Sequence, residues 1–383
     1  MVSCGVRRLW RTPANKGGNM SKLDQLHELG QSTWLNYMRR AFIRSGELRH
    51  CVADGIQGIT ANAAVFQATI AQHEDYDQAI HEEVLSGTPY GRIHTALMVD
   101  DVQRAADILH PIFEESDGLD GFASLELDPA LAHNAVDTVA TAVHLLARID
   151  RVNAMVEVPA TLAGCTAVHS LTADGISTNA THIFSVSTYE RVAQAYISGL
   201  ELYFSRHSVW RIAPTAVASF SVSAVDAAVD PLLGARSLVD WQNQTGIALA
   251  RLLYARFEQI FSGPRWEKLA RKGARPLRPK WTRTRPYNAS QPPTFYTEAL
   301  IGPHTVMTFA PDTLDAFRKH GQVALTLVPG LANALAHLNR LDEMGLDLEG
   351  AMETLQTDHL AASAKQYEAL IKSVQDKLYQ VGK

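Results

Sequence analysis

Strand-like and helix-like segments alternate along almost the whole chain, and this alternation limits the possible folds more than any other feature. Eight short runs rich in apolar and β-branched residues have the character of strands: 32–36, 58–62, 121–127, 154–158, 179–185, 217–221, 279–284 and 306–309. Strands separated by helices predict a parallel α/β fold, and eight of them predict a closed (β/α)8 TIM barrel. The alternative is an open, doubly wound sheet, but no glycine-rich dinucleotide motif follows the first strand.

The intervening segments have apolar residues at helical spacing. The predicted helices are 39–54, 64–72, 81–86, 100–116, 129–149, 164–174, 188–204, 226–233, 239–261 and 312–319, followed by two C-terminal helices near 328–344 and 358–379. The Pro- and Arg-rich segment 264–293 is expected to be a loop-rich excursion around one strand.

Composition excludes several classes of protein. The 383 residues are 46% hydrophobic and carry a net charge of −5, which allows a large core and gives no electrostatic case for nucleic acid. No apolar run approaches the ~20 residues that span a bilayer, so no membrane partner is expected. The cysteines, Cys4, Cys51 and Cys165, are scattered. This pattern favours a reducing, cytoplasmic location over a disulfide framework or a zinc cluster.

The N-terminal segment differs from the rest of the chain. Residues 1–19 are basic and contain no acid, but they lack the apolar region of a signal peptide. We expect residues 1–22 to be a disordered extension and residues 23–383 to form a single barrel domain.

One acid stands in an otherwise apolar strand. In the segment NAMVEVPATLAG (153–164), apolar residues flank Glu157, and Pro159 ends ladder pairing because it has no N–H to donate. An ionised carboxylate in an apolar wall costs several kcal/mol, to an order of magnitude, unless it is paired or functional. Glu157 is therefore the first candidate functional residue.

Several segments resemble, in order, motifs of one known family. They include GQSTWLN, GITANAAVF, DGLDGFASLELDPALAH, AVASFSVSAVDAAVD, KGARPLRPKWTRT and FYTEALIGPHTVMT. These resemble motifs of transaldolases in the long form common in actinobacteria and cyanobacteria, and the resemblance extends from about Leu29 to Leu378. It implies a transaldolase-like barrel with extra C-terminal helices packed on it.

The resemblance also implies roles for single residues. In the family, a glutamate on strand 3 and a threonine on strand 5 hold the catalytic water, while two asparagines and a serine bind the sugar. The matching residues in this sequence are Glu126, Thr181, Asn62, Asn179 and Ser219.

Other positions depart from the family pattern. The lysine on strand 4, which forms a Schiff base with a ketose in the family, is matched by Glu157. The proton-transferring aspartate on strand 1 is matched by Asn36, and the phosphate-binding arginine on strand 6 by Ala224. Because a carboxylate cannot form an imine and an amide cannot shuttle a proton, the family's chemistry is not carried over with the fold.

No other lysine is expected to replace the missing amine. No lysine lies between Lys22 and Lys268, and only Lys280 falls in a predicted strand. Side chains alternate across a strand, so Lys280 points toward the helices if Arg283 and Arg285 point into the barrel mouth. A Schiff base is therefore not expected, barring a bulge in strand 7.

The two glutamates suggest acid–base chemistry. Glu126 and Glu157 lie near the C-terminal ends of adjacent strands, where barrel active sites are found. Two close carboxylates raise the pKa of one of them, which could then act as general acid while the other acts as base. The alternative is a dead site in which Glu157 pairs with an arginine. A divalent metal held by both glutamates and Asn62 is disfavoured because no histidine joins the set, and no metal or cofactor is expected.

The basic residues of predicted strands 5 and 7 are expected to differ in role. Arg283 and Arg285 are predicted to bind a phosphate or carboxylate, replacing the cation lost at Ala224, unless they are solvated loop charges. His182 has the opposite parity to Thr181, so it is predicted to pack behind the barrel.

Three functional hypotheses remain. The first is a divergent enzyme that uses Glu157 and Glu126 on a sugar-phosphate-like or other polar substrate, in a specialised pathway such as secondary metabolism. The second is a non-catalytic homologue that binds a ligand or partner. The third is a transaldolase of the pentose phosphate pathway that transfers dihydroxyacetone by an unconventional route, dependent on Lys280. A monomer or homodimer with a small sugar-like ligand fits all three.

Overall fold

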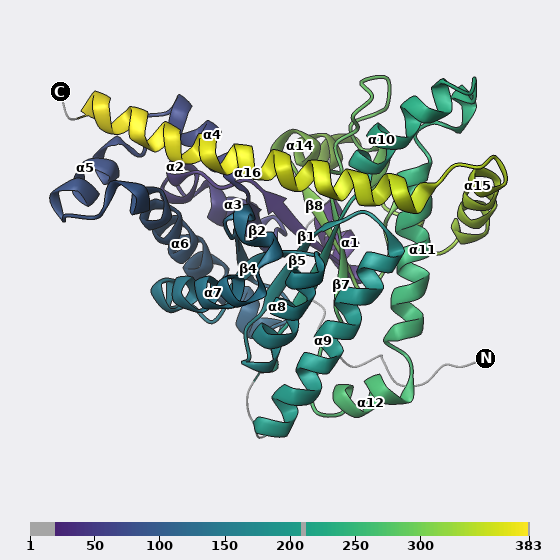
Figure 1. Ribbon diagram of the computed structural model, residues 1–383, viewed down its shortest axis with the longest axis horizontal. Helices are drawn as coiled ribbons and strands as arrows, with labels where there is room; N and C mark the ends of the chain where they lie inside the picture. The colour runs from purple at the N-terminus through teal and green to yellow at the C-terminus, as the bar shows by residue number, and fades with distance from the viewer. Residues whose placement is uncertain (1–19, 208–211, 382–383) are drawn as a thin grey trace.

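The computed structural model describes residues 20–207 and 212–381, and its centre is a closed barrel of eight parallel strands (Figure 1). Each strand pairs with its sequence neighbours and β1 pairs with β8, so the prediction of a (β/α)8 barrel is confirmed. The strands are β1 (Gln31–Asn36), β2 (Gly58–Ala61), β3 (Phe122–Glu126), β4 (Ala154–Pro159), β5 (Thr178–Ile183), β6 (Ala216–Ser221), β7 (Arg278–Thr282) and β8 (Thr305–Phe309).

Helices surround the barrel and fill the connections. They are α1 (Lys22–Glu28), α2 (Arg40–Arg44), α3 (Glu47–Ala53), α4 (Ala63–Gln72), α5 (Asp77–Leu85), η1 (Tyr90–Arg92), α6 (Ile93–Glu115), η2 (Pro129–His133), α7 (Ala135–Ile149), α8 (Leu162–Ala173), α9 (Val186–Arg206), α10 (Val222–Gly234), η3 (Val239–Trp241), α11 (Thr245–Ile260), α12 (Pro264–Ala270), α13 (Phe295–Ala299), α14 (Pro311–His320), α15 (Leu331–Glu343) and α16 (Leu348–Val381).

Two predicted helices are divided and one helix forms where a loop was predicted, each for an identifiable reason. The segment 39–54 forms α2 and α3 because Gly46 adopts a left-handed conformation with φ +90° between them. The segment 129–149 is interrupted at Asn134, whose side chain caps α7 by accepting from the Asp137 N–H. The loop-rich prediction for 264–293 is wrong at its start, where Pro264 occupies the first turn of α12.

The C-terminal helix covers the end of the barrel. Helix α16 runs across the molecule from α15 to α4 and α5, starting ten residues before the predicted 358–379 helix and contacting β5 on its way (Figure 1). Its buried residues, including Leu360, Leu370 and Val374, follow helical spacing. The α16 helix is therefore part of the wall around the C-terminal mouth of the barrel.

The barrel interior is filled rather than open. Its N-terminal end holds a buried network in which Arg278 pairs with Asp120 at 3.0 Å and donates to the Ser32 hydroxyl. Above it lies an apolar layer of Trp34, Phe122, Met155, Val217 and Val306, with Phe113 from α6. Polar groups at the opposite, C-terminal end are therefore separated from solvent below by a packed plug. None of the described helices is long and apolar enough to cross a membrane.

The plug leads to a test of barrel packing. A Cβ atom at Gly58 on β2 would lie 2.4 Å from the buried Trp34 ring, whereas one at Gly91 meets no atom within 4 Å. We predict that Gly58→Ala lowers the free energy of unfolding by about 1–3 kcal/mol, because the indole must move in a filled core. Gly91→Ala is the matched control and should change it by less than about 0.5 kcal/mol. Chemical denaturation measures both, and equal effects would contradict this account of the plug.

Candidate functional site

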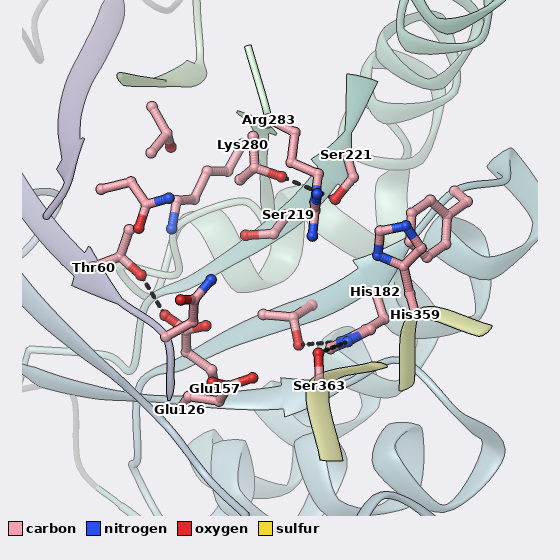
Figure 2. A pocket seen from close by; sticks show the side chains of 16 residues that line it. Thr60, Glu126, Glu157, His182, Ser219, Ser221, Lys280, Arg283, His359 and Ser363 are labelled. Atoms are coloured by element: carbon pink, nitrogen blue, oxygen red, sulfur yellow. Dashed lines mark hydrogen bonds between the residues drawn. The ribbon is translucent and has the colours of Figure 1, made fainter. Parts of the chain in front are cut away.

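A polar cavity opens at the C-terminal mouth of the barrel (Figure 2). Its wall comes from all strands of the barrel or the residues that follow them, and from α16. The lining residues are Asn36, Thr60, Asn62, Glu126, Glu157, Thr181, His182, Phe184, Ser219, Ser221, Lys280, Thr282, Arg283, Thr308, His359 and Ser363. This is the end of a (β/α)8 barrel at which active sites form.

Glu157 is buried and held by hydroxyl groups. Its Oε1 accepts hydrogen bonds from the Thr60 hydroxyl on β2 and, at 2.8 Å, from the Ser124 hydroxyl on β3. Only 7% of the residue surface is exposed. These bonds offset part of the cost of burying the carboxylate and fix its orientation, while Oε2 receives no hydrogen bond from the described residues.

Glu126 lies beside Glu157 in the β3–β4 register. Its Oε2 accepts the Ala63 N–H at 2.7 Å, at the start of α4. Burial, and after it the negative charge of Glu157, raises the pKa of Glu126 to about 8, while the Ala63 hydrogen bond opposes the shift. Glu126 therefore holds a proton at neutral pH, which makes it able to donate one.

A chain of polar side chains leads from β6 to this pair. Ser219 donates to the Asn179 Oδ1 at 2.7 Å, and the Asn179 amide donates to the Ser124 hydroxyl at 3.1 Å. Ser124 in turn donates to Glu157. Ser219 lines the cavity, but Asn179 is fully buried behind it, so Asn179 acts on Glu157 through Ser124 rather than by touching a ligand.

Lys280 points into the barrel, and the prediction that it faces the helices is wrong. Its ammonium lies 4.6 Å from the centre of the Trp34 ring, and the side chain lines the same cavity as Glu157 (Figure 2). Burial lowers the pKa of Lys280 to about 8, although the charge of Glu157 acts in the opposite direction. No carboxylate among the described residues lies within ion-pair distance of it. The barrel therefore contains an amine after all.

The prediction failed because the strand ends at Thr282, two residues before the predicted end at 284. Within β7, Lys280 and Thr282 both line the cavity, so alternate residues do face inward. Arg283 then adopts a left-handed conformation with φ +50°, which turns its side chain inward too. Arg285 lies outside, exposed and paired with Asp312 at 3.1 Å, so its predicted place in the cavity is wrong.

A left-handed backbone conformation also explains the position of His182. This residue lines the cavity, so the prediction that it packs behind the barrel is wrong. Its φ is +57°, and the β5–β6 register shifts between Ala180 and Ile183. His182 Nδ1 lies 3.1 Å from the Thr181 hydroxyl, and Nε2 lies 3.2 Å from the Ser363 hydroxyl of α16. The two consecutive residues Thr181 and His182 therefore share one face.

The other predicted residues lie at the mouth as well. Asn36 ends β1 and lines the cavity, and Asn62 lines it while capping α4 by accepting the Val65 N–H at 3.1 Å. Among the described residues, no group of three or more His, Cys, Asp or Glu is arranged to hold a metal ion.

Comparison with known proteins agrees with this architecture. Residues 33–374 match the family model described as Transaldolase/Fructose-6-phosphate aldolase. The chain belongs to this family. It is 36% identical over 365 residues to the transaldolase of Thermobifida fusca, covering 94% of this chain and 98% of that protein. It is 37% identical over 366 residues to the transaldolase of Parafrankia sp. (94% and 99%) and 35% identical over 363 residues to that of Mycobacterium tuberculosis (93% and 97%).

In this transaldolase-family barrel, sequence reasoning missed the contribution of α16 and of two hydroxyl groups. His359 and Ser363 are four residues apart and face the cavity from one side of the helix. Polar residues at this spacing in an otherwise amphipathic helix can indicate from the sequence that one side of the helix lines a polar site. Thr60 and Thr308 had no comparable signal, because a threonine in a strand is ordinary.

The raised pKa of Glu126 has a consequence for stability. Because its pKa rises from an ordinary 4.5 to about 8 in the folded protein, unfolding releases a proton between these values. Its contribution to stability is thus complete at low pH and is lost as the pH rises toward 8. We predict that the free energy of unfolding of the wild type, relative to Glu126→Gln, falls with a slope of up to about 1.4 kcal/mol per pH unit in this window.

Denaturation of both proteins between pH 5 and 9 measures this difference. Glu353→Gln, at an exposed position of α16 outside the cavity, is the matched control and should follow the wild type. A difference between wild type and Glu126→Gln that stays constant across the range would contradict the assignment.

Proposed function

We propose that the chain is a transaldolase-like enzyme that acts on a sugar-phosphate-like substrate by acid–base chemistry at Glu126 and Glu157. The observation that supports this most is the pair of adjacent carboxylates at the mouth, one of which keeps its proton at neutral pH. The polar lining of hydroxyl, amide and guanidinium groups suits a ligand rich in hydroxyls with an anionic group.

In this proposal Glu157 is the general base. Its Oε1 is occupied by the Thr60 and Ser124 hydroxyls, which leaves Oε2 to accept a proton from a bound substrate. Glu126 is the general acid, with Oε2 bound to the Ala63 N–H and Oε1 carrying the proton. Glu157 can thus accept a proton on one side of a reacting carbon while Glu126 donates a proton on the other side, and neither step requires a metal.

The neighbouring residues have supporting roles. Thr181 would orient a water or hydroxyl between the strands, and the Asn36 and Asn62 amides would bind substrate hydroxyls. Ser219 would bind substrate while Asn179 positions Ser124 behind Glu157.

Replacement of Glu157 tests the base. The protein is incubated in D2O with a panel of ketose and aldose phosphates, and NMR follows exchange of the hydrogen beside the carbonyl. We predict exchange with at least one sugar phosphate and a loss of about 100-fold or more in Glu157→Gln, because an amide cannot accept the proton. The free energy of unfolding should be unchanged or higher, since a buried charge is removed.

Glu353→Gln again serves as the matched control and should exchange like the wild type. Equal exchange in wild type and Glu157→Gln would exclude Glu157 as the base. Binding of a sugar phosphate without any exchange or turnover would favour the non-catalytic hypothesis instead.

A second candidate function, dihydroxyacetone transfer through an imine on Lys280, is favoured by the position of this amine. With a pKa of about 8, roughly a tenth of Lys280 is uncharged at pH 7 and can act as a nucleophile, far more than for an ordinary lysine. The neutral nitrogen would add to a ketose carbonyl carbon, and the carbonyl oxygen would take two protons and leave as water. Glu126 and Glu157 would then supply the proton transfers.

Borohydride trapping decides between the two routes. For the second route we predict that fructose 6-phosphate followed by borohydride gives a stable mass adduct on a Lys280 peptide. Lys280→Met should abolish this adduct, whereas Lys268→Met on α12 should retain it. Glu157→Lys restores an amine at the position that the family resemblance indicates and serves as a positive control. An unadducted wild type beside an adducted Glu157→Lys would exclude the imine route and leave the acid–base proposal standing.

A further inference from the structure

A groove adjoins the polar cavity at the barrel mouth. Asn36, Asn62 and Arg283 line both hollows, so the two are continuous at these residues. From this junction the groove lies between α4 and α16, whereas Glu126 and Glu157 line the mouth cavity alone. We call this second hollow the α4 groove. The acid–base site gives no role to the side chains that line it beyond the junction.

Helix α4 gives the groove a floor of small apolar side chains. Ala64 and Ala68 are one turn apart and line the groove together with Val65. All three residues are half-buried. A longer side chain at position 68 would extend from the helix into the hollow, so the depth of the groove depends on an alanine at this position.

Uncharged amides surround this floor. Asn36 and Asn62 lie at the mouth end, Gln72 ends α4, and Gln366 comes from α16. Among the described residues, none forms a hydrogen bond with the side chain of Asn36, Gln72 or Gln366. Asn62 uses only its Oδ1, to cap α4. Because a carboxamide both donates and accepts, the rim offers paired donors and acceptors to a ligand.

An aromatic ring and few charges complete the lining. Tyr37 is half-buried, and its ring meets that of Phe42 edge-on, at 5.2 Å between centres. The other ionisable residues of the lining are Arg283, which is exposed at the junction, and His73, which follows α4. Among the described residues no carboxylate lines the groove. The groove therefore suits an uncharged, polar ligand that has one apolar face.

Contacts between α4 and α16 fix the width of the groove. The Gln67 amide donates to the Ser373 hydroxyl at 3.2 Å, and the Lys377 ammonium donates to the His73 carbonyl at 2.8 Å. Lys377 also pairs with Asp77 at 2.7 Å. Figure 1 shows α16 passing beside α4 toward α5. The walls are thus set before a ligand binds, which lowers the entropic cost of binding.

We propose that the α4 groove binds a second sugar ring, so that the substrate is a phosphorylated disaccharide rather than a single sugar phosphate. The hydroxyls of a sugar ring donate and accept, which matches the amides, and its C–H face can pack on the Tyr37 ring. The reacting ring then lies beside Glu126 and Glu157, and the second ring lies beyond Asn36 and Asn62. This inference rests on the proposed function, which places the reacting sugar in the mouth.

Isothermal titration of the full chain compares trehalose 6-phosphate and maltose 6′-phosphate with glucose 6-phosphate. We expect at least one disaccharide phosphate to bind about tenfold or more tightly than glucose 6-phosphate, because only the disaccharide reaches the groove. Ala68→Leu should bring this ratio of affinities close to one, since the longer side chain fills the floor. Ala140→Leu, at an exposed position of α7, is the matched control and should keep the wild-type ratio.

A second variant keeps the test decisive if Ala68→Leu does not fold. Gln366→Leu changes an exposed position of α16 and should lower the ratio about threefold, because one hydrogen bond to the second ring is lost. Circular dichroism and thermal unfolding establish that each variant is folded.

Three results would overturn the inference. They are equal affinity of the folded wild type for one ring and two, a wild-type ratio in folded Ala68→Leu, and an equal fall of the ratio in Ala140→Leu. Glu157→Gln should keep the ratio, because this carboxylate does not line the groove. A preference for two rings without any hydrogen exchange would contradict the acid–base proposal and leave the groove standing.

Discussion

The proximity of two largely buried carboxylates at the mouth of the barrel is the constraint on which the rest of the site depends. Glu126 and Glu157 are neighbours in the β3–β4 register, so their separation is fixed by the sheet. Burial, and after it the negative charge of Glu157, raises the pKa of Glu126 to about 8, while hydroxyl donors surround Glu157. This difference between two identical side chains is the basis of the acid and base roles that we propose for them.

The ends of the strands decide which side chains join this pair. His182 and Arg283 both have left-handed rather than extended backbone conformations. Each side chain therefore lines the cavity, although strict alternation along the strand would place it on the opposite face. Together with α16 they make one side of the mouth rich in donors, while the carboxylates and Lys280 occupy the rest.

The extent of successful prediction depends on the kind of signal involved. Periodicity identified all eight strands, and the apolar context of Glu157 identified the central carboxylate, because both are local properties of the sequence. The positions of Lys280, Arg285 and His182 were mispredicted because a single residue with positive φ reverses the facing of the side chains around it, and no residue type at 182 or 283 signals it. The contribution of α16 was missed because it depends on how a distant helix crosses the barrel.

Direct titration of Glu126 tests the central claim most sharply. Carbon-13 NMR of the glutamate side-chain carboxyls, with the Glu126 signal assigned by its loss in Glu126→Gln, follows its protonation from pH 4 to 10. The account predicts a midpoint near pH 8, in line with burial beside an ionised Glu157. A midpoint below about pH 5, near the ordinary value for glutamate, would show that both carboxylates are charged at neutral pH and would contradict the assignment of acid and base.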